Sequence, residues 1–262
     1  MQGLSIIFVT YNCNGLFNSS LSSVCKMAQI IGKFSAVELI ISDDDSCDGT
    51  LESCKDFLTS KFPRLEAKII CSPSNSGGPA FPRNHGIANA RYNYVMFFDA
   101  GDVVVNMEIA EHARQTMKLG YHLIGFGREG QQSSQRPVNK LDVRLLDTKE
   151  IATRNPITLS GSLVSRAFLE KNKLKFCEKL KFVGVEDYDL WIRISRVSNA
   201  RIGMIAGNFI SYERTVGGLS SSGFKRLKPH WRVLSQNFSF SCAMVYFVAR
   251  STVGVYNRVF SR

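Results

Sequence analysis

Residues 94–102 read Tyr-Val-Met-Phe-Phe-Asp-Ala-Gly-Asp, and this stretch decides the fold. Residues 95–98 are all apolar, which predicts a strand buried on both faces at the centre of a sheet. Asp99 and Asp102 follow directly after it. Because open α/β sheets bind ligands beyond the carboxyl ends of their strands, we expect both carboxylates beside a ligand. For Asp102, an ordinary role at a helix start is the alternative.

A divalent cation is the ligand that these two carboxylates suit. Hard cations such as Mg²⁺ and Mn²⁺ prefer carboxylate and phosphate oxygens together. We therefore predict a metal at Asp99 and Asp102, where it would neutralise a diphosphate leaving group.

Short apolar runs elsewhere predict further strands, separated by helical stretches. Strands are expected at residues 4–10, 37–42, 68–71 and 94–98, and helices near 19–31 and 49–60 and from Pro82 onward. Strands that alternate with helices indicate an α/β fold with a mainly parallel sheet. Their carboxyl ends then meet at one crevice.

Polar residues also follow the first two strands. The first strand runs into Thr10-Tyr11-Asn12 and the second into Asp43-Asp44-Asp45-Ser46. Crowded carboxylates raise one another's pKa, so cations or hydrogen-bond donors should lie nearby. One interpretation is that Asp43 accepts the N–H of a nucleobase. The other is an ordinary strand-to-helix turn, which uses the same residue types.

A second acidic pair, Glu186-Asp187, opens a stretch with helical periodicity. In a helix, Asp187 shares a face with Leu190 and Ile194, so its carboxylate would point toward the body of the protein. Partial burial would raise its pKa and suit it to take a proton from a hydroxyl. The alternative is a helix N-terminal acid stabilised by the macrodipole.

Arg83 and Asn84 follow a glycine-rich loop at residues 74–79. They could reach a phosphate or a sugar, since guanidinium forks suit oxyanions. Arg83 could equally brace the acidic strand ends. The chain has no G-x-G-x-x-G or P-loop motif and no serine–histidine arrangement, which argues against dinucleotide oxidoreductases, P-loop NTPases and triad hydrolases.

Length and composition favour one catalytic unit in a reducing compartment. The chain has 262 residues, 44% of them hydrophobic, which suits one large domain with an appendage. Its seven cysteines show neither a C-x-x-C pair nor zinc-finger spacing. The N-terminus lacks the features of a secretory signal, so we expect a cytoplasmic protein.

The basic charge lies at the C-terminus. Of the net charge of +11, eight Lys or Arg residues with no Asp or Glu fall between Arg214 and Arg262. Residues 238–249 are uncharged and largely apolar, but are shorter than the roughly 20 residues of a spanning helix. We therefore predict a domain at 1–222 and a basic segment at 223–262 that lies on the inner face of an anionic membrane. A core-packing terminal helix with a basic outer face is the alternative.

Together these segments resemble the family 2 glycosyltransferases, which have the GT-A nucleotide-diphospho-sugar transferase fold. The resemblance runs from Leu4 to about Ser222 and rests on an ordered set of motifs: SIIFVTYN at 5–12, ISDDDSCDGT at 41–50, GGPAFPRNHGI at 77–87, FDAGD at 98–102 and EDYDLW at 186–191.

The resemblance implies an inverting transfer from a nucleotide sugar, most simply a UDP-sugar. Asp187 would be the catalytic base, and Asp99 and Asp102 would serve the metal and the diphosphate. Glu186 and Trp191 would lie on the acceptor side. The nucleotide sugar would contact Thr10, Tyr11, Asn12, Asp43, Asp44, Arg83, Asn84, Asp99 and Ala100.

Two positions depart from the family pattern. Gly101 stands where the family usually has a second metal-binding aspartate, which could shift ligation to Asp102 or weaken it. Asp45 stands where glycine is common.

The chain looks most similar to small bacterial members that build colanic acid, O-antigen or capsule, so the expected acceptor is a glycan on a lipid-diphosphate carrier and no nucleic acid is expected. A nucleotidyltransferase and a non-catalytic sugar-nucleotide-binding protein are the alternatives.

Overall fold

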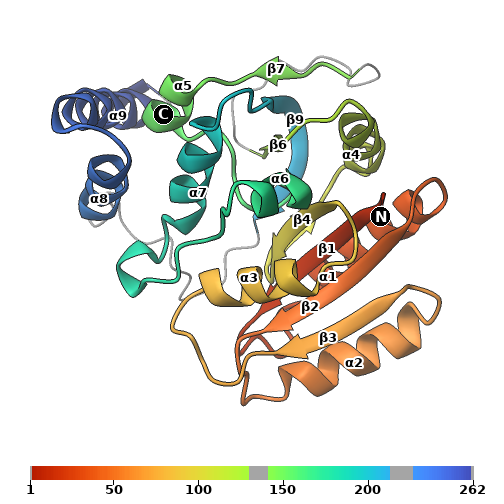
Figure 1. Ribbon diagram of the computed structural model, residues 1–262. Helices are drawn as coiled ribbons and strands as arrows, with labels where there is room; N and C mark the ends of the chain where they lie inside the picture. The colour runs from red at the N-terminus through yellow and green to blue at the C-terminus, as the bar shows by residue number, and fades with distance from the viewer. Residues whose placement is uncertain (1, 130–140, 213–226, 261–262) are drawn as a thin grey trace.

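The computed structural model describes residues 2–129, 141–212 and 227–260, with side chains as far as residue 252. Its centre is a sheet with the strand order β3-β2-β1-β4-β8-β6-β9-β5. The first four strands in that order are parallel to one another, and Figure 1 shows them side by side. They are β3 (Ala67–Cys71), β2 (Val37–Asp43), β1 (Leu4–Thr10) and β4 (Tyr94–Asp99).

The other half of the sheet is mixed. β8 (Leu163–Ser165) runs antiparallel to β4 and to β6 (Leu123–Arg128), while β9 (Ile202–Tyr212) runs parallel to β6. Two short strands, β5 (Asp102–Val104) and β7 (Arg144–Leu145), pair with β9 in the antiparallel sense. The predicted α/β fold with a mainly parallel sheet is confirmed, and each of the four predicted strands is present within one residue of its expected bounds.

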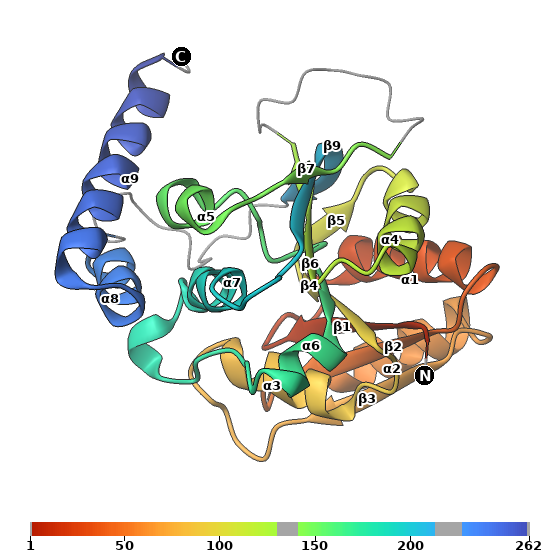
Figure 2. The same cartoon turned by 45° about the horizontal axis from the view of Figure 1, so that its top comes forward.

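Helices cover both faces of the sheet because strand residues alternate between the faces. Leu4, Ile6 and Phe8 pack against α1 (Asn18–Gly32), α2 (Thr50–Lys61) and α4 (Glu108–Lys118). Ile7 and Val9 belong to the second core, on the face covered by α3 and the later helices (Figure 2). These helices are α3 (Ala80–Asn89), α5 (Thr148–Arg154), α6 (Arg166–Lys171) and α7 (Glu186–Ser195), with the 3-10 turn η1 (Leu180–Phe182) before α7.

Two C-terminal helices extend the second core. α8 (Leu227–Asn237) packs on α7 and η1, and α9 (Phe240–Phe260) packs on α5 and α8. Val233, Leu234 and Ala243 have no exposed surface. In the described part of the chain, every helix is too short or too polar to cross a bilayer. Of the eight basic residues between Arg214 and Arg262, five lie outside the residues whose side chains are described: Arg214, Lys225, Arg226, Arg258 and Arg262.

Candidate active site

A buried arginine joins three segments at the carboxyl end of the parallel strands. Arg83, in α3, is 3% exposed. Its Nη1 donates to Glu186 Oε1 at 2.6 Å, and its Nη2 donates to Asp99 Oδ2 at 2.8 Å and Oδ1 at 3.0 Å. The end of β4, the first half of α3 and the start of α7 are therefore held together by one side chain. We call Arg83 with these two carboxylates the Arg83 clamp.

The clamp keeps the guanidinium charged. Burial alone would lower the pKa of Arg83, but the charges of Asp99 and Glu186 raise it above its ordinary value. Glu186 is also buried, and its Oε2 accepts a hydrogen bond from the Gly184 amide at 2.6 Å. Of the two roles that the sequence leaves open for Arg83, the structure shows the bracing one.

Asp187 lies beside the clamp, in the first turn of α7. Its side chain is half-buried, and its Oδ1 accepts from the Tyr188 amide at 2.6 Å. Burial and the charge of Glu186 raise the pKa of Asp187 to about 7, against the opposing effect of Arg83, and Asp99 raises it further. The pKa of Asp187 therefore depends on the charge of Asp99, at the end of β4, as well as on its neighbours in α7.

Asp102 is more enclosed than Asp99. Asp99 keeps 39% of its side chain exposed, whereas Asp102 is buried and accepts a hydrogen bond from the Ser160 hydroxyl. Burial and then the charge of Asp99 raise the pKa of Asp102 to about 7. Ser160 Oγ also accepts from the Asp99 amide at 3.2 Å, so one hydroxyl ties the two acids together. Asp102 begins β5, not a helix.

The aspartates after β2 serve their own loops. Asp43 has no exposed surface, and its carboxylate accepts from Thr10 Oγ1, the Ser46 amide and Ser46 Oγ, each at 2.7 Å. The backbone N–H of Asn12, whose φ is 42°, donates to Ser46 Oγ at 2.8 Å. In this structure the Asp43 carboxylate holds the loops after β1 and β2, and its contact with a nucleobase stays a prediction.

Asp44 closes a second loop in the same way. It is 3% exposed and accepts from Asn75 Nδ2 at 3.2 Å and from Ser76 Oγ at 2.9 Å. The end of β2 is thereby fastened to the glycine-rich loop before α3. Around these loops, Tyr11 is 50% exposed and Ala100 is half-buried, so both remain accessible to a ligand.

Asn84 and Trp191 both lie in contacts within the protein. The Asn84 side chain donates to the Phe176 carbonyl and accepts from the Phe176 amide, both at 2.9 Å, and donates to Glu178 at 2.7 Å, so it fastens the segment before α7. Trp191 has no exposed surface and packs edge to face on Phe176, 6.2 Å between ring centroids. It belongs to the core and does not face an acceptor.

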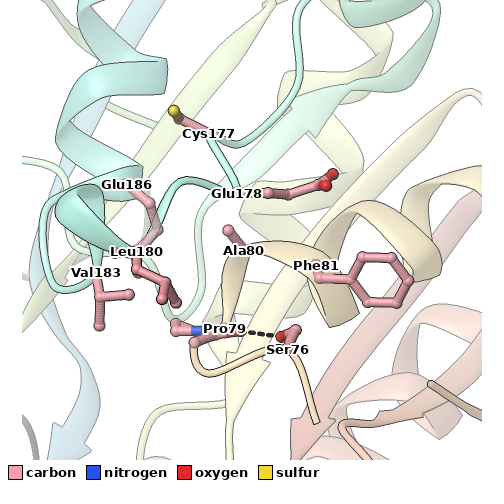
Figure 3. A pocket seen from close by; sticks show the side chains of 10 residues that line it. Ser76, Pro79, Ala80, Phe81, Cys177, Glu178, Leu180, Val183 and Glu186 are labelled. Carbon is pink, nitrogen blue, oxygen red and sulfur yellow. Dashed lines mark hydrogen bonds between the residues drawn. The ribbon is translucent and has the colours of Figure 1, made fainter. Parts of the chain in front are cut away.

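A hollow of about 180 Å³ opens next to the clamp (Figure 3). Glu186 forms part of its wall, Ser76 and Phe81 come from the loop and start of α3, and Cys177, Leu180 and Val183 come from the segment before α7. It therefore lies between α3 and the start of α7, two of the three segments that the clamp joins.

The family model described as glycosyl transferase family 2 matches residues 5–171. The chain belongs to this family. The match covers the parallel strands, the DAGD turn and Arg83, and it confirms the predicted glycosyltransferase over the nucleotidyltransferase and the non-catalytic binder.

Relatives of this glycosyltransferase include two bacterial enzymes. It is 25% identical to the Escherichia coli UDP-Glc:alpha-D-GlcNAc-diphosphoundecaprenol beta-1,3-glucosyltransferase WfgD, over 94% of this chain and 90% of that protein. It is 28% identical to the Staphylococcus aureus poly(ribitol-phosphate) beta-N-acetylglucosaminyltransferase TarS over 69% of this chain, which spans only 30% of that longer protein.

Solved structures show the same fold. S. aureus TarS 1-349 superposes with a TM-score of 0.68 at 20% identity, over 99% of this chain and 72% of that one. The Pyrobaculum calidifontis mannosyltransferase PcManGT, in complex with GDP-Man and Mn²⁺, superposes with a TM-score of 0.67 at 14% identity, over 98% of this chain and 74% of that one. The GT-A fold of this glycosyltransferase is thereby confirmed.

Metal binding by the glycosyltransferase would rest on few protein ligands. In residues 2–129, 141–212 and 227–252, no three His, Cys, Asp or Glu side chains gather as a metal site. Gly101, with φ of 105°, separates the two acids of the turn. Mg²⁺ and Mn²⁺ sites can nevertheless take one or two carboxylates and complete their shell with substrate phosphates and water. The half-exposed Asp99 fits such a site, and Asp102 fits it once ionised.

Sequence reasoning missed Ser160, Asn75 and Ser76. Ser160 lies in an irregular stretch 58 residues from Asp102, its partner, and carries no motif. A signal for Ser76 was present in the sequence. Three successive aspartates need hydrogen-bond donors, and Ser76 in the glycine-rich loop supplies one.

We expect Arg83→Met to lower the free energy of unfolding by about 3 kcal/mol, because it leaves Glu186 buried without its partner. Urea denaturation of the purified protein measures this. Arg144→Met is the matched control, since its pair with Glu150 is largely exposed and should be worth about 1 kcal/mol or less. In Arg83→Met/Glu186→Gln, part of the loss should return; equal losses in the single and double variants would contradict the clamp.

Proposed function

We propose that this glycosyltransferase moves a sugar from a UDP-sugar to a hydroxyl of a lipid-diphosphate-linked glycan, with inversion, during assembly of a bacterial surface polysaccharide on the cytoplasmic side of the membrane. Support for the donor and acceptor comes from WfgD, which matches nearly the whole chain and whose name specifies both. The observation that carries the mechanism is Asp187, a half-buried carboxylate of raised pKa beside the Arg83 clamp.

Donor binding falls to the exposed groups at the strand ends. Tyr11 follows β1 with half of its side chain exposed, which suits it to lie against the nucleoside. Asp99 and Asp102 would hold the divalent metal, which when bound offsets the charge of the diphosphate leaving group. Thr10, Asp43 and Ser46 position the loops around this site through their mutual hydrogen bonds.

Asp187 then acts as the base. The acceptor O–H bond breaks as the oxygen forms its bond to the anomeric carbon, and the proton passes to the Asp187 carboxylate. The bond between the anomeric carbon and the diphosphate breaks on the opposite side, and the electron pair leaves with the nucleotide. Arg83 neutralises Glu186 and Asp99 at short range but leaves the pKa of Asp187 raised, so this carboxylate retains affinity for a proton.

Asp187→Asn should lower kcat by about 10²–10⁴-fold, because the amide cannot accept the proton. UDP-sugar binding should persist, as measured by thermal shift, since Asp187 is assigned to the acceptor. Asp56→Asn, at an exposed position on α2, is the control. Retained turnover in Asp187→Asn would remove this residue from the mechanism.

The pH dependence of kcat/KM should report the ionisation of Asp187 in the free enzyme. The base must be deprotonated, and its pKa is raised to about 7, so the rate should fall as pH decreases through about 7. In Glu186→Gln, a neighbouring negative charge is lost and the falling limb should move to lower pH. A limb in the ordinary carboxyl range for the unsubstituted enzyme would contradict the assignment.

Metal dependence is tested at Asp99. UDP with Mn²⁺ should stabilise the protein in a thermal-shift assay by up to about 3 kcal/mol at saturating ligand. Asp99→Asn should abolish the part of the shift that requires Mn²⁺. If EDTA leaves the UDP shift unchanged, the proposed cation is not used.

A further inference from the structure

The surface formed by α8 and the first half of α9 carries exposed apolar side chains on one side. On α9, Phe240, Met244, Val245 and Val248 are 74%, 40%, 65% and 53% exposed. Their spacing of four, five and eight residues places them on one side of a helix. The opposite side of α9 packs inward through Ala243. The exposed stripe therefore reflects the orientation of the helix and not a loosely packed end.

A groove continues this surface between the two helices. It encloses about 530 Å³ and is lined by Leu227, Lys228, Trp231, Arg232, Ser235 and Phe247. The Trp231 ring lies 5.9 Å from that of Phe240 and 5.5 Å from that of Phe247, edge to face. Aromatic and aliphatic groups thus lie next to two cationic side chains.

The described charges on these two helices have one sign. Within residues 227–252 the charged residues are Lys228, Arg232 and Arg250, and none is acidic. The neighbouring turn adds the exposed Lys179 and Lys181, and Arg232 Nη1 donates to the Lys181 carbonyl at 2.6 Å, which fixes the turn against α8. Apolar groups with cations beside them complement a surface that offers both acyl chains and phosphates.

We propose that the exposed sides of α8 and of residues 240–248 form a docking face for an anionic phospholipid bilayer. The apolar side chains of α9 enter the boundary between headgroups and acyl chains, and Lys228 and Arg232 contact lipid phosphates. Figure 1 shows α8 and α9 at the edge of the molecule opposite α2, so the docking face is free of the sheet.

Docking also bears on how the acceptor arrives, a point that rests on the proposed function. Leu180 lines the hollow beside the Arg83 clamp, while the next residue, Lys181, is bonded to Arg232 of the groove. The turn η1 therefore lines one hollow and contacts a residue that lines the other. A glycan held at the bilayer by its lipid would have a short path over η1 to Glu186 and Asp187.

Co-sedimentation with vesicles tests the docking face. The full chain should bind vesicles of equal parts phosphatidylglycerol and phosphatidylcholine and should bind phosphatidylcholine vesicles more weakly. Phe240→Glu/Val245→Glu should weaken binding to the anionic vesicles by at least about tenfold, and Lys228→Glu by about tenfold. Two controls should bind normally: Phe34→Glu/Leu145→Glu, which replaces exposed apolar residues elsewhere, and Lys55→Glu on α2.

Three results would overturn the proposal: equal binding to both kinds of vesicle, unchanged binding by the two docking-face variants, or a dimer that Phe240→Glu/Val245→Glu converts to a monomer in sedimentation analysis. The last would assign the face to a second copy of the chain. Thermal shift with UDP, measured on every variant, confirms folding and separates the two hypotheses. Normal UDP binding without vesicle binding rejects only the docking face, whereas vesicle binding without any UDP-sugar binding rejects only the proposed function.

Discussion

The charge balance around Arg83 is the constraint on which the site depends. Four acids lie near one another at the end of β4 and the start of α7, and burial and mutual repulsion raise the pKa values of Asp102 and Asp187. A single buried guanidinium offsets part of this repulsion by pairing with Asp99 and Glu186. Because its two partners come from opposite ends of the site, the same contact sets the distance between the donor-binding strand ends and the helix that carries Asp187.

The elements of the fold could be predicted from sequence because the signals are local. Short apolar runs of three to five residues, each followed by polar turn residues, define β1 to β4, and a period of three to four residues defines α7. The short strands in the mixed half of the sheet could not be predicted. Its strands β5, β7 and β8 have only two or three residues each, too few for any periodicity, and they form because β9 and β4 offer unpaired edges.

The site was harder to predict, because it depends on which partner each polar group finds. Arg83 and Glu186 are 103 residues apart, and nothing local specifies their pairing. Asp43 has the residue type and position of a ligand-binding acid, yet Thr10 and Ser46 take up its oxygens. The burial of Trp191 could not be predicted for another reason. Helical periodicity indicates which single face of a helix is buried, whereas α7 is covered on nearly all sides because α5 and α8 also pack on it.

The backbone at Gly101 restricts which residue can occupy this position. Its φ of 105° lies in a region that glycine adopts freely and that other residues enter only with strain, roughly 1–3 kcal/mol. An aspartate at this position would add a carboxylate to the turn, but a single substitution would have to overcome that strain or reshape the start of β5. Restoring an aspartate at position 101 would therefore trade fold stability against cation affinity at a single residue.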